Sequence, residues 1–397
     1  MTQTDLPLDG IKVIDLGQYI AGPGAAMILG ELGADVIKIE PLSGDQSRHT
    51  GSYGASIVKT YNQNKRSIAI DLKNPQGRDV ATRLISSSDV LIQNLRPGAA
   101  ERLGLGAAAM CGLQPRLVYM SVSGFGTTGP AADRVGLDIA AQAESGLMSV
   151  TGDPDGLPQK VGVPIIDAAT THVVAQAVLT ALLRRERTGR GSVIETSLLQ
   201  VALSLQASNF TDYLTRGVEP HRTGNGQPNN APAAELVTTK DGIIVLSAYA
   251  EDHWARFCRL FGKAHLIDDP RFRTNEARVA NRKDLRIALA DMLSDFTSDD
   301  CVDLLTKNQI VAGVVRSYRS ARESAAVDAT GIFRRTQDGR TPSYETLGLP
   351  YRFADIPSQE PRPLPTIGED SEDVLRSAGF DDDRIFELLA SRIVAST

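Results

Sequence analysis

The chain has few residues of the kinds that build metal and disulfide sites. Its three cysteines, Cys111, Cys258 and Cys301, lie far apart in 397 residues and form no CxxC pair. This spacing argues against a zinc site or a disulfide framework. The five histidines show no HxxxH spacing, so no helical metal site is indicated. The scarcity of cysteine favours a reducing, cytoplasmic compartment.

The sequence also shows no basic stripe, and it predicts no signal peptide and no membrane-spanning helix. The formal net charge is -6, whereas a nucleic-acid binder usually carries a basic face, so we expect no nucleic-acid partner. The first residues lack a basic region followed by an apolar core, and no signal peptide is expected. The apolar stretch after Asp167 is interrupted by His172 and Gln176. We expect it to be too short to cross a bilayer, and we expect no membrane partner.

Strand and helix patterns alternate in the first 125 residues. The patterns predict strands at 11–16, 34–40, 67–72, 89–92 and 117–122, with helices at 25–32 and 76–86. A helix between two strands at this spacing implies parallel pairing through a right-handed crossover. The alternation therefore predicts a doubly wound α/β fold.

A glycine-rich stretch at 223–230 interrupts the chain after helices expected near 198–215. Its composition fits either a mobile loop or a linker. Beyond it, the patterns predict a strand at 242–247 and helices near 253–261, 283–306, 371–378 and 383–391. We expect three segments: 1–220 as the first part of a large domain, 221–340 as a linker with a small domain, and 341–397 as a connector whose helices return to the large domain.

The first strand–helix–strand unit matches a dinucleotide site only in part. Gly22 and Gly24 follow a strand, and Glu40 ends the next one. The G-x-G-x-x-G/A fingerprint requires a third small residue where this chain has Met27, and Pro23 sits in the turn. The sequence therefore disfavours a nicotinamide site, and a structural role for these glycines stays open.

Basic residues recur around the ends of the predicted strands. They are Lys38, Arg48, Lys65, Arg66, Lys73, Arg96 and Arg102. Doubly wound sheets bind ligands at the carboxyl ends of their strands, so such a set could hold the phosphates of a nucleotide-like ligand. Scattered surface charge explains the same pattern, and the sequence leaves both interpretations open.

Asp167 is the carboxylate in the most apolar setting. It follows a short apolar run at 161–166 and precedes a long, largely apolar helix with a basic last turn before Gly189. The amides and dipole at a helix N-terminus favour a negative charge there. Asp167 is an N-cap by residue type and a candidate catalytic carboxylate by its setting.

Residues that match a known family extend along nearly the whole chain. They lie at 22–23, 32–41, 44–45, 48, 64–68, 71–73, 94–98, 123–126, 129–130, 138, 142–143, 145–146, 189–191 and 224–230. In these residues the chain resembles the family III coenzyme A transferases, a family that also includes alpha-methylacyl-CoA racemases. The resemblance implies a Rossmann-like large domain, a smaller α+β domain and an interlocked homodimer.

The resemblance also implies roles for individual residues. Asp167 takes the place of the family's catalytic aspartate. Implied CoA contacts are Lys38, Leu72, Lys73, Asn94, Leu95, Arg96 and Arg102, with Leu72 near the adenine. The loop of Gly224, Asn225, Gly226 and Gln227 is implied to close over the reacting carboxylate, and Asp138 to shape the site.

Two positions depart from the family's best-known members. Racemases that resemble this family have a histidine where this chain has Leu137. Because a two-base racemase needs an acid and a base on opposite faces of the carbon, Leu137 disfavours racemisation. Formyl-CoA transferases have tyrosine at that position and glutamine at the position of Ile20. Both replacements would make the pocket more apolar, so we expect a larger, partly apolar acid in place of oxalate.

The reaction implied by the resemblance is transfer of CoA from an acyl-CoA thioester to a free carboxylic acid. It passes through an aspartyl anhydride and an aspartyl–CoA thioester, which is covalent catalysis. Coenzyme A enters as part of the substrate, and no metal or other cofactor is expected. Two further functions stay open: an acyl-CoA racemase or epimerase, and a CoA-binding protein without catalysis.

Overall fold

The computed structural model describes residues 6–337, 342–356 and 360–397, and it divides into two compact units. The first holds the chain up to Leu147, Val161–Phe210 and the chain from Thr330; the second holds Met148–Lys160 and Thr211–Ala329. The long segment of the second unit thus begins at Thr211, ten residues before the predicted 221, and this unit also includes Met148–Lys160, which was expected in the large domain. The residues from Thr330 onwards, expected in the small domain as far as 340, belong to the first unit. The predicted boundary at 340/341 lies outside the described residues.

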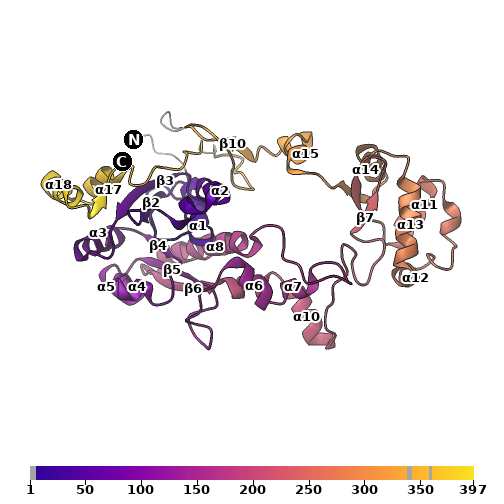
Figure 1. The fold of residues 1–397 in the computed structure, drawn as a ribbon, viewed down its shortest axis with the longest axis horizontal. Coiled ribbons are helices and arrows are strands. Elements are labelled where there is room, and N and C mark those ends of the chain that lie inside the picture. Colours follow the sequence, from indigo (N-terminus) through magenta and orange to yellow (C-terminus); the bar gives the residue numbers. More distant parts are fainter. Residues whose placement is uncertain (1–5, 338–341, 357–359) are drawn as a thin grey trace. The chain divides into compact units, whose positions relative to one another are not determined.

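A seven-stranded sheet forms the centre of the first unit (Figure 1). In spatial order its strands are β12 (Val394–Ala395), β3 (Lys65–Ile70), β2 (Asp35–Glu40), β1 (Lys12–Asp15), β4 (Val90–Gln93), β5 (Val118–Ser123) and β6 (Ser192–Ser197). The six strands β3, β2, β1, β4, β5 and β6 pair in parallel, and β12 is antiparallel to β3. This order is that of a doubly wound sheet, whose winding reverses between β1 and β4. The predicted α/β class with a parallel-dominated sheet is confirmed.

Helices cover both faces of this sheet. They are α1 (Ala21–Glu31), α2 (Gly51–Tyr61), α3 (Pro75–Ser86), α4 (Ala99–Arg102), α5 (Ala107–Leu113), α6 (Asp138–Glu144), α8 (Ile165–Thr188), α9 (Leu198–Ser204), α17 (Ser371–Ser377) and α18 (Asp382–Ala390). Alternate strand residues point to opposite faces. Val13 and Val90 pack in one core with α1, α6, α8 and α9, whereas Ile14 and Leu91 pack in another with α3, α5, α17 and α18. Burial on both faces explains the continuous apolar strands.

The predicted strands and helices of the first 125 residues occur in the structure, and most of their ends are displaced by one residue at most. The largest difference is α1, which begins at Ala21 in place of residue 25. Pro23 falls in its first turn, where a missing N–H leaves no intrahelical bond unmade. Helix α2, helix α6 and strand β6 were not predicted, because apolar residues do not recur in their sequences with a clear helical or strand periodicity.

Helix α8 is longer than the sequence suggested. It begins at Ile165, before Asp167, and its 24 residues exceed the roughly 20 that cross a bilayer. The prediction that it is too short is therefore wrong, and by length and composition it is the one helix of the described ranges that could span a membrane. Val174, Val178 and Leu182 pack against the sheet, which accounts for its apolar composition.

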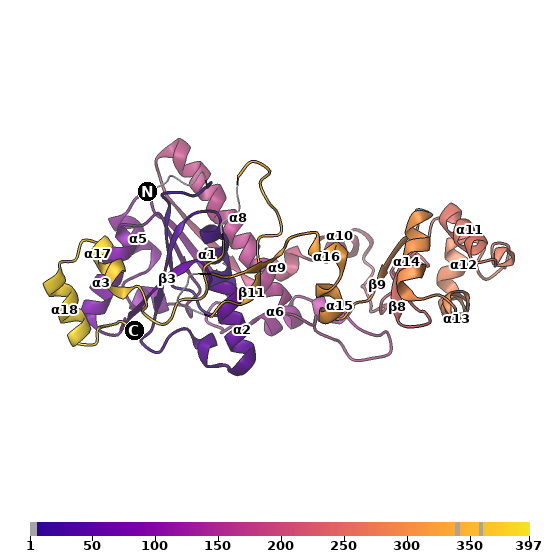
Figure 2. The ribbon, with the colours of Figure 1, turned by 90° about the horizontal axis from the view of Figure 1, so that it is seen from above.

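The C-terminal residues return to the first unit. Helices α17 and α18 lie beside α3 (Figures 1 and 2), where Arg83 donates a hydrogen bond of 2.7 Å to the carbonyl of Gly379. Val394 and Ala395 then pair with Ile70 and Ala69. The hairpin of β10 (Phe333–Arg335) and β11 (Glu345–Leu347) precedes this segment. The last strand of the chain thus closes an edge of a sheet built from the first strands.

The second unit is built on a three-stranded antiparallel sheet of β7 (Glu235–Thr238), β8 (Ile243–Ser247) and β9 (Val311–Val314). Its helices are α11 (Glu251–Leu260), α12 (Asn275–Ala280), α13 (Arg282–Leu293), α14 (Ser298–Lys307), α15 (Tyr318–Arg322) and α16 (Ala325–Asp328). Helices α7 (Leu147–Val150) and α10 (Ala207–Arg216) fall across the limits between the units. In the core of the second unit, Trp254 stacks on Phe257 and meets Phe272 edge-on.

Helix α1 crosses α8 at Gly24, and this crossing is testable. A Cβ at Gly24 would lie 2.6 Å from Thr171 Oγ1 and 3.0 Å from Tyr61 Cδ1. Overpacking of this kind costs about 1–3 kcal/mol. We expect Gly24→Ala to lower the free energy of unfolding by that amount in urea denaturation. Gly112→Ala is the control, since no atom lies within 4 Å of its added Cβ. Equal stability of the two variants would contradict this role of Gly24.

Candidate active site

Asp167 lies in the first turn of α8, which begins after Pro164. The opposite end of α8 is anchored by Arg185, whose Nη1 lies 2.8 Å from Oδ1 of Asp89, the residue before β4. Because α8 ends at the amino ends of the parallel strands, its first turn lies at their carboxyl ends. Doubly wound sheets bind their ligands at that edge.

Asp138, the first residue of α6, caps α8. Its Oδ2 accepts hydrogen bonds from the N–H groups of Ile166 at 2.7 Å and Asp167 at 3.1 Å, and its Oδ1 accepts one from Gln142 Nε2. The N-cap residue, Pro164, makes no side-chain cap, so Asp138 satisfies amides that a helix start leaves free. The interpretation of Asp167 as an ordinary N-cap is therefore wrong.

The Asp167 carboxylate is half-buried and accepts no hydrogen bond from the residues that the structure describes. Burial raises its pKa to about 7, and the charge of Asp138 acts in the same direction. A carboxylate that is partly desolvated and bound by no donor keeps its lone pairs available for attack on an electrophile. Geometry and charge thus favour Asp167 as a nucleophile.

Tyr61, the last residue of α2, also belongs to this site. Burial raises the pKa of its phenol, and the charge of Asp167 adds to the effect. Its ring meets α1 at Gly24, beside Thr171 of α8. Sequence reasoning missed Tyr61 because nothing in its neighbourhood marks it, and α2 itself was not predicted.

Lys38 is buried among the loops instead of facing a ligand. Its Nζ donates a hydrogen bond of 2.8 Å to the carbonyl of Gly17 and lies 3.0 Å from Oδ2 of Asp45. Burial disfavours its charge, but Asp15 and Asp45 outweigh burial and hold its pKa above the usual value. Its side chain is 1% exposed. The ammonium group of Lys38 is therefore occupied within the protein, and the predicted CoA contact of Lys38 stays a prediction.

Lys65, from β3, occupies the same buried network. Its Nζ lies 2.7 Å from Oδ2 of Asp15, 2.7 Å from the carbonyl oxygen of Pro23 and 2.9 Å from Oδ1 of Asn62. Burial lowers its pKa to about 8, against the attraction of Asp15. Lys65 therefore joins the end of β1, the first turn of α1 and the end of α2, and is not available to phosphate.

Asn94, in the loop after β4, is hydrogen-bonded to the loop after β1, at the point where the winding of the sheet reverses. Its Oδ1 accepts the N–H of Gln18 at 2.8 Å, and its Nδ2 donates to the carbonyl of Gln18 at 2.9 Å. The amide is therefore occupied, and only the backbone of Asn94 is left for the predicted CoA contact. Leu95 follows β4 and Leu72 follows β3, and both side chains are half-buried.

Three of the predicted CoA contacts carry exposed positive charges. Lys73 follows β3, Arg96 follows β4, and Arg102 ends α4. Arg48 and Arg66, in contrast, are held in ion pairs with carboxylates of β2. Since β3 and β4 end at the same edge of the sheet, the three exposed cations lie at its carboxyl edge. The seven basic residues therefore separate into structural and ligand-accessible groups.

The two positions that depart from the family differ in exposure. Ile20 precedes α1 and is 4% exposed, whereas Leu137 precedes α6 and is 60% exposed. Ile20 is thus an apolar part of the protein interior at the start of α1. The expectation that Leu137 lines an apolar pocket stays a prediction.

The tip of the glycine-rich loop is exposed at Gly224 and Asn225. Gly224 has a φ of 67°, and its N–H donates a hydrogen bond of 3.1 Å to the carbonyl of Gly152. Arg222 donates to the carbonyls of Ser149, Asp153 and Gly156. These bonds explain why Met148–Lys160 belongs to the second unit.

The base of the same loop is fixed by Arg282. Arg282 pairs with the buried Glu235 and donates hydrogen bonds to the carbonyls of Gln227 and Asn230. Gly226 is buried against this pair, where a side chain has no room. The loop is therefore ordered at its base and differs from a free linker.

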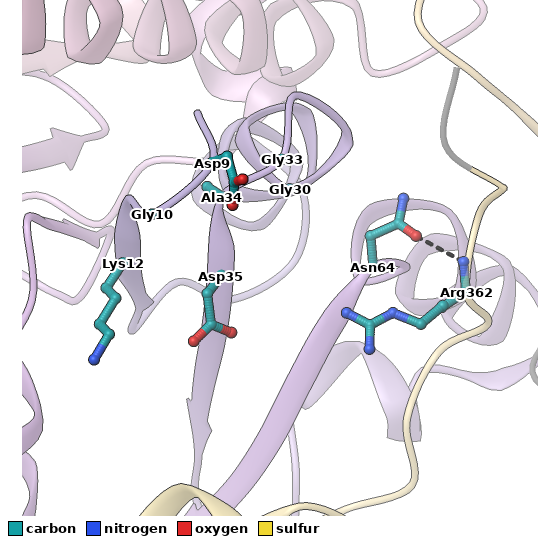
Figure 3. A pocket seen from close by; sticks show the side chains of 9 residues that line it. All are labelled: Asp9, Gly10, Lys12, Gly30, Gly33, Ala34, Asp35, Asn64 and Arg362. Carbon is teal, nitrogen blue, oxygen red and sulfur yellow. Dashed lines mark hydrogen bonds between the residues drawn. The ribbon is translucent and has the colours of Figure 1, made fainter. Parts of the chain in front are cut away.

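The pocket drawn in Figure 3 lies at the amino ends of the parallel strands, opposite the edge that carries Asp167. It measures about 350 Å³, and Lys12 and Asp35, which line it, begin β1 and β2. On its far side Asn64 Oδ1 accepts the N–H of Arg362 at 2.6 Å. It contains none of the predicted site residues, so the candidate active site is not this pocket.

Comparison with known proteins gives the same reaction class. The family model for CoA-transferase family III matches residues 8–371. The chain belongs to this family. The succinate–glutarate CoA-transferase of Agrobacterium fabrum is 35% identical over 383 residues, covering 93% of this chain and 95% of that protein.

Further relatives of this family III CoA-transferase agree. The succinyl-CoA:glutarate CoA-transferase of Mus musculus is 33% identical, over 98% of this chain and 90% of that protein. A crystal structure of a CAIB/BAIF family protein from Brucella suis has a TM-score of 0.87 and 33% identity, covering 95% of this chain and all of that one. The enzyme is therefore a family III CoA-transferase with the fold of its relatives.

The raised pKa of Asp167 makes a prediction about stability. The pKa of Asp167 in the folded state, about 7, exceeds the ordinary value of 3.8. At pH values between these two, the folded state therefore keeps a proton on Asp167 that the unfolded state has lost. Stability from this group is present at low pH and is lost as the pH rises through about 7. Asp167→Asn should therefore be more stable than the wild type at about pH 8, by on the order of 1 kcal/mol.

Thermal unfolding at about pH 4 and about pH 8 measures this difference, which should be much smaller at the lower pH, close to the ordinary pKa of 3.8. Asp155→Asn, at an exposed position, is the matched control and should follow the wild type at both. A difference between Asp167→Asn and the wild type that does not change with pH would contradict the assignment.

Proposed function

We propose that this enzyme transfers CoA from an acyl-CoA thioester to a free carboxylic acid, with Asp167 as the nucleophile. The observation that carries the proposal is the half-buried carboxylate of Asp167, bound by no donor of the described residues and held at the carboxyl edge of the sheet. Membership of CoA-transferase family III supports the reaction class.

In the first half of the proposed reaction, an oxygen of Asp167 bonds to the carbonyl carbon of the donor thioester. The carbon–sulfur bond breaks, and the CoA thiolate leaves with the electron pair. The thiolate then attacks the Asp167 carbonyl carbon of the resulting anhydride, and the donor acid leaves as a carboxylate. The enzyme is left as an aspartyl–CoA thioester, an intermediate that splits one difficult exchange into easier steps.

The second half runs in reverse with the acceptor. The acceptor carboxylate attacks the aspartyl thioester, the thiolate leaves, and a second anhydride forms. Attack of the thiolate on the acceptor carbonyl gives the new acyl-CoA and frees Asp167. All bonds are exchanged between carboxylates and one thiol, so the proposal uses no metal or other cofactor.

The other site residues have supporting roles in this proposal. Asp138 positions the turn that carries Asp167 by binding its amides. The exposed Lys73, Arg96 and Arg102 hold CoA phosphates as charge-assisted partners, with Leu72 near the adenine and Leu95 beside them. The role that the family resemblance implies for the loop of Gly224 and Asn225, closure during the reaction, stays a prediction.

We also infer a Rossmann-like mode of CoA binding and an interlocked homodimer. The strand order of the large sheet supports the first. Large apolar side chains exposed in the single chain support the second, among them Leu183 of α8, Val193 of β6 and Leu214 of α10. Surfaces of this kind are typical of protein interfaces.

A mass measurement on the intact protein tests the nucleophile. Incubation with acetyl-, succinyl- and longer-chain CoA thioesters should add CoA to the wild type, and the adduct should map to Asp167. Asp167→Ala should lose transfer while it keeps CoA binding. Asp167→Glu should also fail, because one methylene displaces the attacking oxygen from its near-attack position.

The control is Asp79→Ala on the exposed side of α3, which should form the adduct at the wild-type rate. Transfer above a few per cent in Asp167→Ala would remove Asp167 from the mechanism. Solvent deuterium exchange at the alpha carbon without transfer would indicate a racemase, and CoA affinity without either reaction would indicate a binding protein.

Acceptor preference is a separate prediction. Buried Ile20 and the names of the glutarate-using relatives favour dicarboxylates larger than oxalate. We expect kcat/KM for succinate or glutarate to exceed that for oxalate by at least about tenfold, the range that pocket size can supply. Ile20→Gln should shift the ratio towards oxalate. A wild type that prefers oxalate would overturn this expectation.

A further inference from the structure

Tyr61 and the first turns of α8 meet at one point on α1. At Gly24, the position of an added Cβ lies 3.0 Å from Tyr61 Cδ1 and 2.6 Å from Thr171 Oγ1. Thr171 Oγ1 donates a hydrogen bond of 3.1 Å to the carbonyl of Asp167, one turn earlier. The absence of a side chain at Gly24 thus brings the Tyr61 ring close to the turn that carries Asp167.

Both polar groups at this meeting point have unused hydrogen-bonding capacity. Tyr61 and Asp167 are both half-buried, and neither the hydroxyl of Tyr61 nor the carboxylate of Asp167 has a hydrogen-bond partner among the residues described. Asp167 is also the charged group that acts most strongly on the phenol. A phenol and a carboxylate are complementary donor and acceptor.

The end of α2 is held firmly, so the position of Tyr61 is defined. The next residue, Asn62, accepts a hydrogen bond of 2.9 Å from the buried Lys65 and donates one of 3.1 Å to the carbonyl of Val58. Lys65 also binds the carbonyl of Pro23 in α1. The same buried ammonium group therefore fixes both helices that flank Asp167.

We propose that Tyr61 is a further catalytic residue, whose O–H donates a hydrogen bond to one oxygen of Asp167 during the reaction and leaves the other oxygen to attack. The phenol keeps its proton throughout. The attacking oxygen bonds to the thioester carbonyl carbon, and the breaking carbon–sulfur bond gives its electron pair to the thiolate. This inference rests on the proposed nucleophile and adds the group that orients it.

Tyr61→Phe tests the inference, because it keeps the ring against Gly24 and removes only the hydroxyl. The rate constant for formation of the CoA adduct, measured by rapid quench, should fall about 10–100-fold. The dissociation constant for CoA should change less than about twofold. The ascending limb of the pH–rate profile should move to higher pH, because losing a donor to a carboxylate raises its pKa.

The pH measurement isolates Asp167, because few titratable groups face it. Asp138 of α6 and Tyr61 of α2 are the groups coupled to it. Tyr53, on the same helix, acts on Tyr61, and His172 of α8 is exposed.

Tyr53→Phe is the matched control, since Tyr53 is 63% exposed and two turns away on α2. It should keep the wild-type rate. Rates are normalised to CoA-binding sites, so partial unfolding of either variant does not count as lost catalysis. A rate within twofold of the wild type in Tyr61→Phe, an unshifted pH limb, or an equal loss in Tyr53→Phe would overturn the inference. Absence of an adduct in the wild type would instead overturn the proposed function.

Discussion

The contact between Asp138 and the first turn of α8 is the interaction on which the site depends. Asp138 occupies the amides of Ile166 and Asp167, and its charge helps to raise the pKa of Asp167. A helix start normally satisfies its amides with a nearby side chain. Because Asp138 comes from another helix to do so, the carboxylate of Asp167 stays unbound. One contact thus positions the proposed nucleophile and adds to the effect of burial on its pKa.

A second constraint is the buried charge network below the loops. Lys38 and Lys65 bind Asp15, which in turn accepts the N–H of Gly17 at 2.7 Å. Burying charges is costly unless they are paired and hydrogen-bonded, and here the charges also hold backbone groups of the loop after β1. Asn94 binds the next residue of that loop. The loops at the carboxyl edge are therefore preorganised by side chains that no ligand needs to contact.

The sequence predicted the features that follow from local patterns of apolar residues or from the resemblance to a known family. Strands as far as β5 follow from apolar runs, and Asp167 was recognised from its apolar surroundings. Contacts distant in sequence could not be predicted: Asp138 caps a helix 28 residues later, and Lys38 finds its partners only after folding. Tyr61 lies on a helix without a strong apolar period. The glycines that suggested a cofactor site serve packing, because Gly24 lets α1 approach Thr171.

Strand β12 has a consequence for synthesis on the ribosome. Its two residues, Val394 and Ala395, cover the edge of β3, which is complete by Ile70. More than 300 residues are therefore made while one edge of the parallel sheet is unpaired. Open edges are templates for aggregation, and chains that expose them during folding are the usual clients of chaperones. A folded chain without Val394 and Ala395 would keep that edge of β3 unpaired.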